Sequence, residues 1–192
     1  VTGGAIRIGN IDIRDVKQHD LRNRIGYIPQ KATLFSGTIE SNLRYADENA
    51  TDSTIENALE VSQAKEFVSK MPSGIEEAIS QGGTNVSGGQ KQRLSIARAL
   101  VKNADIYIFD DTFSALDYHT DALLREALNK MVKEKHSTVF IVAQRISSIM
   151  HADKIIVLDQ GKIVGNGTHA ELMKNCPVYQ EIAYSQLSRK EL

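Results

Sequence analysis

Apolar and polar positions alternate near the beginning of the chain, which predicts short antiparallel strands. Residues 5–8 and 11–13 alternate on either side of Gly9-Asn10, a dipeptide typical of a tight hairpin turn. Residues 25–28 form another strand-like run, which a proline ends because proline cannot donate a backbone hydrogen bond. We therefore expect a hairpin, then a buried strand, then a polar loop over residues 30–37.

The next part of the chain has helical spacing of its apolar residues. Residues 38–70 predict a block of helices, in which Asp52 and Ser53 are suited to cap a helix with Ile55 and Leu59 on one face. Glycines precede another helix, predicted at about 89–101. Its inward residues are expected to be Leu94, Ala97, Leu100 and Val101.

Two continuous apolar runs, 106–109 and 138–142, predict strands buried on both faces of a parallel sheet. The intervening segment 118–133 has helical spacing, so strand, helix and strand form a right-handed crossover. A shorter helix is expected at 145–150. The apolar positions of the helix at 118–133 are Ala122, Leu123, Ala127, Leu128, Met131 and Val132.

The last part of the chain predicts a second hairpin, 154–158 with 162–164, followed by short helices at 169–174 and 178–187. Taken in order, the elements indicate an α/β fold in which a sheet layer carries a helical subdomain.

Composition adds few constraints to this picture. With 192 residues, 41% of them hydrophobic, the chain suits a single domain. The 23 basic and 24 acidic residues are dispersed and give no footprint for nucleic acid. Its single cysteine, Cys176, suits a reducing compartment. No apolar run approaches the roughly 20 residues that span a bilayer, so no direct membrane insertion is expected.

Asp110 and Asp111 directly follow the apolar run 106–109. Ligands of α/β sheets bind at the carboxyl ends of the strands, and a carboxylate there can hold Mg²⁺ for phosphoryl transfer. Acidic residues that cap the following turn are the structural alternative.

A second candidate site begins at Ser87, where Gly88 and Gly89 open a predicted helix and Gln90 follows. Glycines let a phosphate approach the backbone, and the helix N-terminus favours negative charge. An ordinary serine-capped helix is the structural alternative.

The order of these motifs resembles the nucleotide-binding domain of ABC transporters over essentially the whole chain. Residues 85–90 are similar to the family signature, which usually begins with leucine, and 106–111 to the Walker B strand. Residues 114–117 match the D-loop, and Gln30 corresponds to the Q-loop glutamine.

This resemblance implies a P-loop NTPase-like core sheet flanked by helices, with an inserted helical subdomain. The chain would form one nucleotide-binding domain, with the core at 1–36 and 102–192 and the subdomain at about 37–101. It also implies ATP and Mg²⁺ as ligands. By resemblance Asp110 and Gln30 hold the metal, Gln30, Ser87, Gly88, Gly89, Gln90 and Asp117 bind the nucleotide, and Asp111 and Gln144 occupy the catalytic positions.

Residues 34–39 with Asn42-Leu43 are similar to the stretch that follows the Q-loop in exporters whose membrane and ATPase domains share a chain. The resemblance therefore implies transmembrane domains as partners, a location at the cytoplasmic face of the membrane, and ATP hydrolysis coupled to transport.

The sequence departs from the family in lacking the P-loop pattern Gly-x-x-x-x-Gly-Lys-Ser/Thr. We expect that the chain begins after the Walker A strand, loop and helix, that the isolated fragment is inactive, and that the remaining sheet exposes apolar surface or pairs with another chain.

Two departures concern hydrolysis. Asp111 stands where the family has its catalytic glutamate, and Gln144 where it has the switch histidine. Aspartate is one methylene shorter, and glutamine cannot carry the imidazolium charge. With the signature intact, these changes favour a heterodimer with a second ABC domain, in which this chain's own site hydrolyses poorly and its signature serves the partner's site. The alternatives are a non-hydrolysing regulatory module and a soluble ABC ATPase without a transport role.

Overall fold

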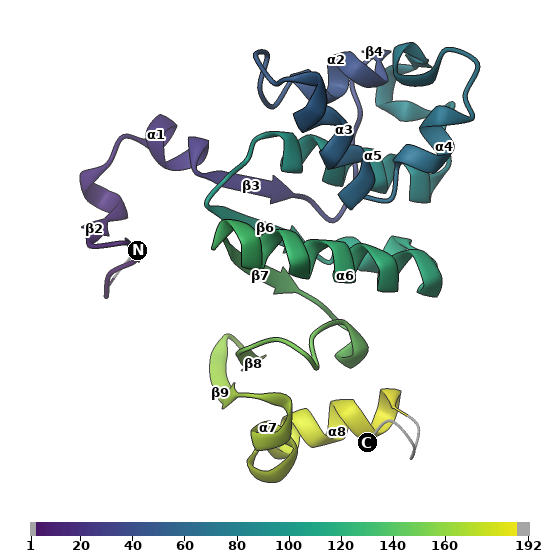
Figure 1. The fold of residues 1–192 in the computed structure, drawn as a ribbon. Helices are drawn as coiled ribbons and strands as arrows, with labels where there is room; N and C mark the ends of the chain where they lie inside the picture. Colours follow the sequence, from purple (N-terminus) through teal and green to yellow (C-terminus); the bar gives the residue numbers. More distant parts are fainter. Residues whose placement is uncertain (1–2, 188–192) are drawn as a thin grey trace. The chain divides into compact units, whose positions relative to one another are not determined.

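The computed structural model of the protein describes residues 3–187. The chain forms two compact units, Val1–Phe140 and Ile141–Leu192, which are described separately (Figure 1). The fold is mixed α/β, as the order of elements predicts.

The first unit opens with the expected hairpin, although its strands are short. Strand β1 (Arg7–Ile8) pairs antiparallel with β2 (Ile11–Asp12), and Ile8 lies opposite Ile11. Helix α1 (Gln18–Asn23) follows and leads into the sheet.

The central sheet of the first unit contains two of the predicted strands in parallel. Strand β3 (Ile25–Ile28) pairs with β6 (Ile106–Asp110), and the sheet order is β3-β6-β7, with β7 at Thr138–Val142. Gly26 lies opposite Tyr107, where a Cβ atom would come within 2.6 Å of the tyrosine ring. Glycine is therefore required for β3 to lie this close to the Tyr107 ring.

Burial of the strands differs from the prediction. Tyr107 and Phe109 of β6 are buried, but 138–142 is not buried on both faces, because Thr138, Phe140 and Val142 are exposed. Tyr27 of β3 is also 53% exposed. An apolar run shows that burial would be favourable, whereas actual burial depends on which elements pack against that face. The expected exposed apolar surface is thus present among the described residues.

Four α-helices, with short 3₁₀ turns, form the part of the first unit between β3 and β6, together with two short paired strands. The elements are β4 (Gly37–Thr38), α2 (Ile39–Arg44), α3 (Asp52–Val61), α4 (Lys65–Ser69), β5 (Ala78–Ile79) and α5 (Gly88–Val101).

The helix α3, over Asp52–Val61, is capped by a residue other than the predicted Asp52 and Ser53. The Thr54 amide donates to Thr51 Oγ1 at 3.2 Å. Asp52 and Ser53 were the wrong caps because the helix begins at Asp52, and the N-cap residue precedes the first helical residue.

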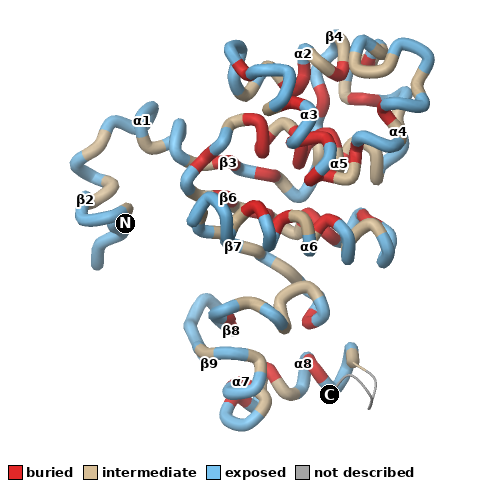
Figure 2. Tube along the Cα trace, viewed as in Figure 1, coloured by how far each residue is buried: buried red, intermediate tan, exposed pale blue. Residues whose placement is uncertain are grey.

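Helix α5 carries much of the core, as the buried segments of Figure 2 show. Its four predicted inward residues are all buried, and so are Ile55 and Leu59 of α3. The burial on α5 extends beyond the apolar stripe to Gln92 and Ser95. This helix therefore lies inside the first unit rather than on its surface.

Helix α6 (Tyr118–Lys135) buries some of its apolar positions and exposes others. Leu124, Leu128 and Met131 are buried, whereas Ala122 and Leu123 are exposed. Both sets of residues have helical spacing, so periodicity alone does not choose between adjacent faces. Packing chooses the face that includes Leu124.

The second unit is a hairpin with two helices, close to the prediction. Its core consists of Ile146, Ile155, Val157, Leu172, Cys176, Tyr179 and Ala183. Where a helix was expected at 145–150, only a short 3₁₀ helix forms, Ile146–Ser148. The other elements are β8 (Ile155–Asp159), β9 (Lys162–Gly167), α7 (His169–Asn175) and α8 (Pro177–Gln186).

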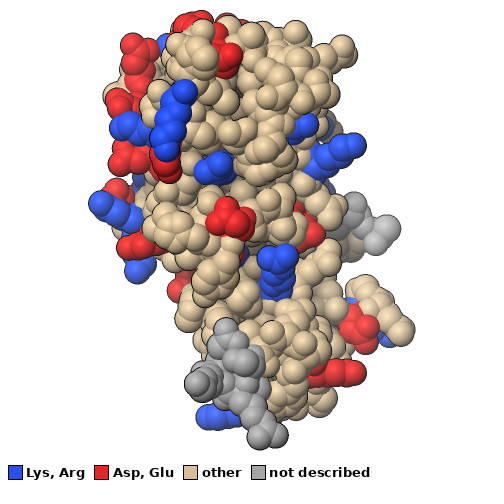
Figure 3. All heavy atoms as spheres, turned by 90° about the vertical axis from the view of Figure 1, so that its right-hand side faces the viewer, with Lys and Arg blue, Asp and Glu red and all other residues tan. Residues whose placement is uncertain are grey.

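Charged side chains of both signs are intermingled on the face shown in Figure 3. Within residues 3–187, no helix is both long and apolar enough to cross a membrane.

Replacing a buried leucine of α5 should destabilise the protein strongly. Leu94 is 1% exposed, so Leu94→Ala should lower the free energy of unfolding by about 2–5 kcal/mol, through lost burial and the cavity left behind. Urea denaturation measures the change. Leu123→Ala is the matched control, because Leu123 is 40% exposed and should cost less than about 1 kcal/mol. Equal losses would contradict the central position of α5.

Candidate functional site

The carboxyl ends of β3 and β6 bring together residues that lie far apart in the sequence. Because the strands are parallel and Ile28 pairs with Phe109, Gln30 and Asp111 leave the sheet at the same edge. The Gln30 side-chain amide donates to Asp111 Oδ2 at 3.1 Å. Two residues predicted from separate motifs are therefore in direct contact.

Asp110 has a partner that the sequence analysis missed. The Tyr27 hydroxyl donates to Asp110 Oδ2 at 2.9 Å. This hydrogen bond to the carboxylate is the main cause that raises the pKa of Tyr27 above its ordinary value. Tyr27 pairs with Ile108, and side chains two residues apart share a face, so the register of the two strands could have revealed the contact.

The turn after β6 holds Asp111 in a left-handed backbone conformation, with φ 43° and ψ 33°. Aspartate tolerates this region better than most residues other than glycine. The Ser114 hydroxyl donates to the Asp111 carbonyl at 2.8 Å, and buried Thr112 donates to the Ile28 carbonyl at 3.3 Å. These two hydroxyls, neither predicted as a site residue, fix the direction in which Asp111 leaves the sheet.

Helix α5 begins with a capping box at Ser87. The Gln90 amide donates to Ser87 Oγ at 3.2 Å, and the Ser87 amide donates to Gln90 Oε1 at 3.0 Å. The serine-capped helix that was one alternative for this motif therefore forms. Such a cap leaves the dipole of the helix N-terminus in place, so it is compatible with an anion site.

No close contact with the described residues requires glycine at either of the two glycine positions of this motif. A Cβ atom at Gly88 would have no heavy atom within 4 Å, and one at Gly89 would meet only the Ala115 carbonyl, at 3.8 Å. Neither residue has the positive φ that favours glycine. Glycine at a helix start is less favourable than alanine, so a requirement from outside the chain would explain both positions.

Asp117 caps helix α6. Its carboxylate accepts from the Thr120 amide at 3.0 Å and from the Thr120 hydroxyl at 2.7 Å. The Thr120 amide is the main cause that lowers the pKa of Asp117. A contribution of Asp117 to nucleotide binding stays a prediction beside this structural role.

Gln144 belongs to the second unit, and the contacts that follow lie within that unit. The Gln186 side chain donates to the Gln144 carbonyl at 2.8 Å and accepts from the Ile146 amide at 2.8 Å. Gln186, which no sequence motif singles out, thereby fixes the backbone on both sides of Arg145.

The described part of the chain contains no group of three or more His, Cys, Asp or Glu side chains that could hold a metal by themselves. The oxygen atoms of Asp110, Asp111 and Gln30 are nevertheless the hard ligands that Mg²⁺ prefers. Mg²⁺ bound together with a phosphate ligand needs only one or two protein carboxylates, and this donor set fits that requirement.

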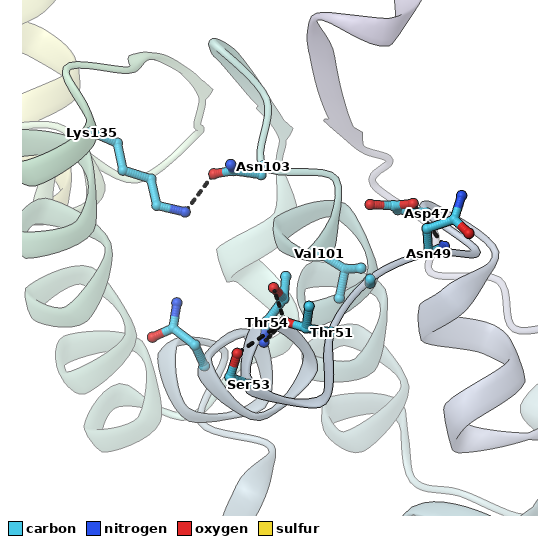
Figure 4. Close-up of a pocket in the computed structure, with 10 residues that line it drawn as sticks. Asp47, Asn49, Thr51, Ser53, Thr54, Val101, Asn103 and Lys135 are labelled. Carbon is cyan, nitrogen blue, oxygen red and sulfur yellow. Dashed lines mark hydrogen bonds between the residues drawn. The ribbon is translucent and has the colours of Figure 1, made fainter.

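Two cavities lie in the helical part of the first unit, with volumes of about 370 and 390 Å³. Figure 4 shows the first, where Lys135 Nζ donates to Asn103 Oδ1 at 2.6 Å and Ser53 and Thr54 line the opposite side. None of the predicted site residues lines either cavity. The candidate chemistry is therefore at the sheet edge and the start of α5.

Comparison with known proteins decides the family. A profile described as ABC transporter matches residues 1–114. This chain belongs to the ABC transporter family. An uncharacterised ABC transporter ATP-binding protein of Mycobacterium tuberculosis is 46% identical over 189 residues, which are 97% of this chain and 32% of that protein.

Two further relatives are named as a flippase and as an ABC exporter. An ATP-dependent lipid A-core flippase of Desulfotalea psychrophila is 40% identical over 92% of the ABC chain and 31% of the flippase. The structure of a bacterial Atm1-family ABC exporter with ATP bound matches with a TM-score of 0.92 and 34% identity, over 98% of this chain and 33% of that one. The chain has the fold of an exporter-type ATP-binding domain and spans about a third of the length of these relatives.

The contact between Tyr27 and Asp110 in this ABC domain can be tested by titration. A raised pKa means that the stabilisation from this hydrogen bond is fully present below the ordinary tyrosine pKa of about 10 and is lost as the pH rises through the higher value in the folded state. The ultraviolet difference titration between wild type and Tyr27→Phe should therefore have its midpoint above about 10.

Asp110→Ala provides the control, because it removes the acceptor. The Tyr27 signal should then titrate nearer to about 10. A wild-type midpoint that does not move on this substitution would mean that the hydroxyl is not held by Asp110.

Proposed function

We propose that this chain is the nucleotide-binding part of an ABC exporter, in which MgATP binding and hydrolysis are coupled to transport across a membrane. The longer protein would work at the cytoplasmic face of the membrane, with transmembrane domains and a second ABC domain as partners. The relative named as an ATP-dependent flippase and the ATP-bound exporter of similar fold support this proposal.

The observation that carries the proposal is the cluster at the ends of β3 and β6. Gln30 contacts Asp111 there, and Asp110 lies next in the chain. Asp110 and Gln30 would supply the protein's oxygen ligands to Mg²⁺, and the bound ion would neutralise charge on the phosphates during their transfer. A structural cap alone would not require two acidic residues and an amide from another strand.

The start of α5 would serve a second chain. Ser87 and Gln90 orient the helix N-terminus through the capping box, and the open space at Gly88 and Gly89 leaves room for phosphates held by the partner. In this arrangement each chain contributes to two sites, its own sheet edge and the partner's.

We further propose that this chain's own site hydrolyses ATP poorly. Asp111 has a shorter side chain than glutamate, and its carboxylate is already held by Gln30. A general base must reach the attacking water at about 2.6 to 3.2 Å, so one missing methylene has a large effect. Gln144 can donate a hydrogen bond but cannot become charged. The partner in a heterodimer would carry out most of the hydrolysis.

A regulatory module that binds ATP without hydrolysing it is the second candidate, and the same two residues favour it. For both candidates the proposed domain division is the one implied by the family resemblance, with a core at 1–36 and 102–192 and a helical subdomain at about 37–101. The third candidate, a soluble ABC ATPase without transport, lacks support from the relatives, which are named as ABC transporter proteins, a flippase and an ABC exporter.

Restoring the family residues tests whether the site is impaired by its side chains. Asp111→Glu combined with Gln144→His, in the full-length transporter, should raise ATP turnover at this site by about tenfold or more, because it restores a base of the right length and a titratable imidazole. Single-turnover hydrolysis with the partner's site inactivated measures it. Unchanged turnover with intact ATP binding would favour the regulatory module.

The backbone at Asp111 supplies a control for that experiment. Glutamate is less suited than aspartate to the left-handed conformation, so Asp111→Glu should cost stability of about 1 kcal/mol, seen as a lower Tm. The Gln144→His variant alone should not show that loss.

The signature can be tested independently of this chain's own hydrolysis. Ser87→Phe should reduce ATPase activity of the complete transporter by about tenfold or more, since a bulky side chain fills the space before the helix and removes the capping oxygen. Ser87→Thr retains the hydroxyl and should keep most of the activity. If the phenylalanine variant were as active as the threonine variant, α5 would not contribute to a shared site.

A further inference from the structure

Loop 31–36, which continues from Gln30, is held mainly by side chains and backbone groups from elsewhere in the first unit. The Arg98 guanidinium donates through Nη2 to the Thr33 carbonyl at 2.8 Å. The Gly82 amide donates to the Leu34 carbonyl at 3.1 Å. Buried Asn42 accepts from the Phe35 amide at 2.8 Å and donates to the Phe35 carbonyl at 2.9 Å. Of these contacts, only the one from Arg98 comes from α5.

Arg98 is a half-buried cation on a helix that is otherwise largely buried. Burial lowers the pKa of its guanidinium. Within residues 3–187 it forms no salt bridge, and its buried Nη1 has no hydrogen-bond partner. Its guanidinium carbon lies 5.2 Å from the centroid of the Phe35 ring. Arg98 therefore directs both of its interactions to the same loop.

Stability alone does not account for an arginine at this position. A half-buried, incompletely paired cation carries a desolvation cost, and an apolar side chain of similar length would avoid it. The planar guanidinium, in contrast, can donate to a carbonyl and stack on an aromatic ring at the same time. Its geometry suits the fixing of a loop better than the filling of a core.

We propose that Arg98 is a positioning residue, which fixes the loop after Gln30 to the helix that begins at Ser87. Gln30 contacts Asp111, so the loop joins the sheet-edge cluster to α5. Arg98 sets the position of this loop relative to the helix. The consequence for turnover rests on the proposed function, but the anchoring itself does not.

Arg93, earlier on the same helix, provides a matched comparison. Its Nη1 donates to the Gln63 carbonyl at 3.0 Å, and its guanidinium carbon lies 4.7 Å from the centroid of the Phe67 ring. Both arginines thus combine a carbonyl with an aromatic ring, but Arg93 holds the turn between α3 and α4. Changing each arginine should loosen a different segment.

The experiment is amide hydrogen exchange on the full-length protein without nucleotide, comparing wild type, Arg98→Met and Arg93→Met. Methionine retains an apolar stem and removes the donors and the charge. In Arg98→Met the amides of Phe35 and Gly82 should exchange roughly tenfold faster, while the amides of α5 and the Tm stay unchanged or the Tm rises. In Arg93→Met the faster exchange should appear around residue 63 instead.

Three results would overturn the proposal. These are unchanged exchange at Phe35 and Gly82 in Arg98→Met, equal acceleration there in Arg93→Met, and acceleration of all α5 amides, which would indicate a general structural role. If Arg98→Met does not fold, Arg98→Lys replaces it, since lysine keeps the charge but cannot donate and stack together. The amides of Phe35 and Gly82 should then exchange more slowly in Arg98→Lys than in the neutral variant Arg98→Gln. Equal exchange in these two variants contradicts the anchor.

A second measurement separates this proposal from the proposed function. MgATP binding by the wild-type protein tests the function, whereas exchange at Phe35 and Gly82 in the absence of nucleotide tests the anchor. Loss of the anchor in Arg98→Met together with normal ATP binding by the wild type supports both. If exchange is faster in Arg98→Met but the wild type does not bind ATP, the anchor is supported and the proposed function is contradicted.

Discussion

The arrangement of the first unit depends on one helix, α5, which is buried along most of its length and holds its neighbours through basic side chains. Its apolar residues supply the core, and burial of this kind is the main favourable term in folding. Arg93, Arg98 and, just past its end, Lys102 each donate to a backbone carbonyl of another segment, at Gln63, Thr33 and Arg22. The same helix begins at the signature serine. One element therefore joins the core, the loop after Gln30 and the helix start proposed to bind nucleotide together with a partner.

A second constraint is the parallel pairing of β3 with β6. It brings Gln30 to Asp111 and Tyr27 to Asp110 from opposite ends of a long intervening segment. The close approach at Gly26, where Tyr107 leaves no room for a side chain, holds this register. The chemistry at the edge of the sheet thus follows from strand packing, and the sites proposed for MgATP inherit their geometry from it.

The sequence was most informative where a strong local signal agreed with tertiary packing. The strand at 25–28 and the buried face of α5 were predicted because continuous or periodic apolar residues leave little choice, and the family motifs indicated the ABC fold. The exposed side of 138–142 was not predicted, and the apolar positions of α6 did not by themselves show which of them lie inward, because neighbours from elsewhere in the chain select these faces. Tyr27, Thr112 and Gln186 were missed for a similar reason, since their importance arises from partners distant in sequence. The residues that bind nucleotide and metal remain predictions from the motifs.

The partners of Arg93, Arg98 and Lys102 have a consequence for how the first unit responds to its solvent. Carbonyl oxygens and aromatic rings do not titrate in the acidic range, whereas the carboxylate of Glu40, which pairs with Arg44, can be protonated. Added salt also screens the attraction between two opposite charges, whereas a carbonyl acceptor carries no net charge. The attachments of α5 should therefore persist in mild acid and at high ionic strength, conditions that weaken the ion pairs on the surface.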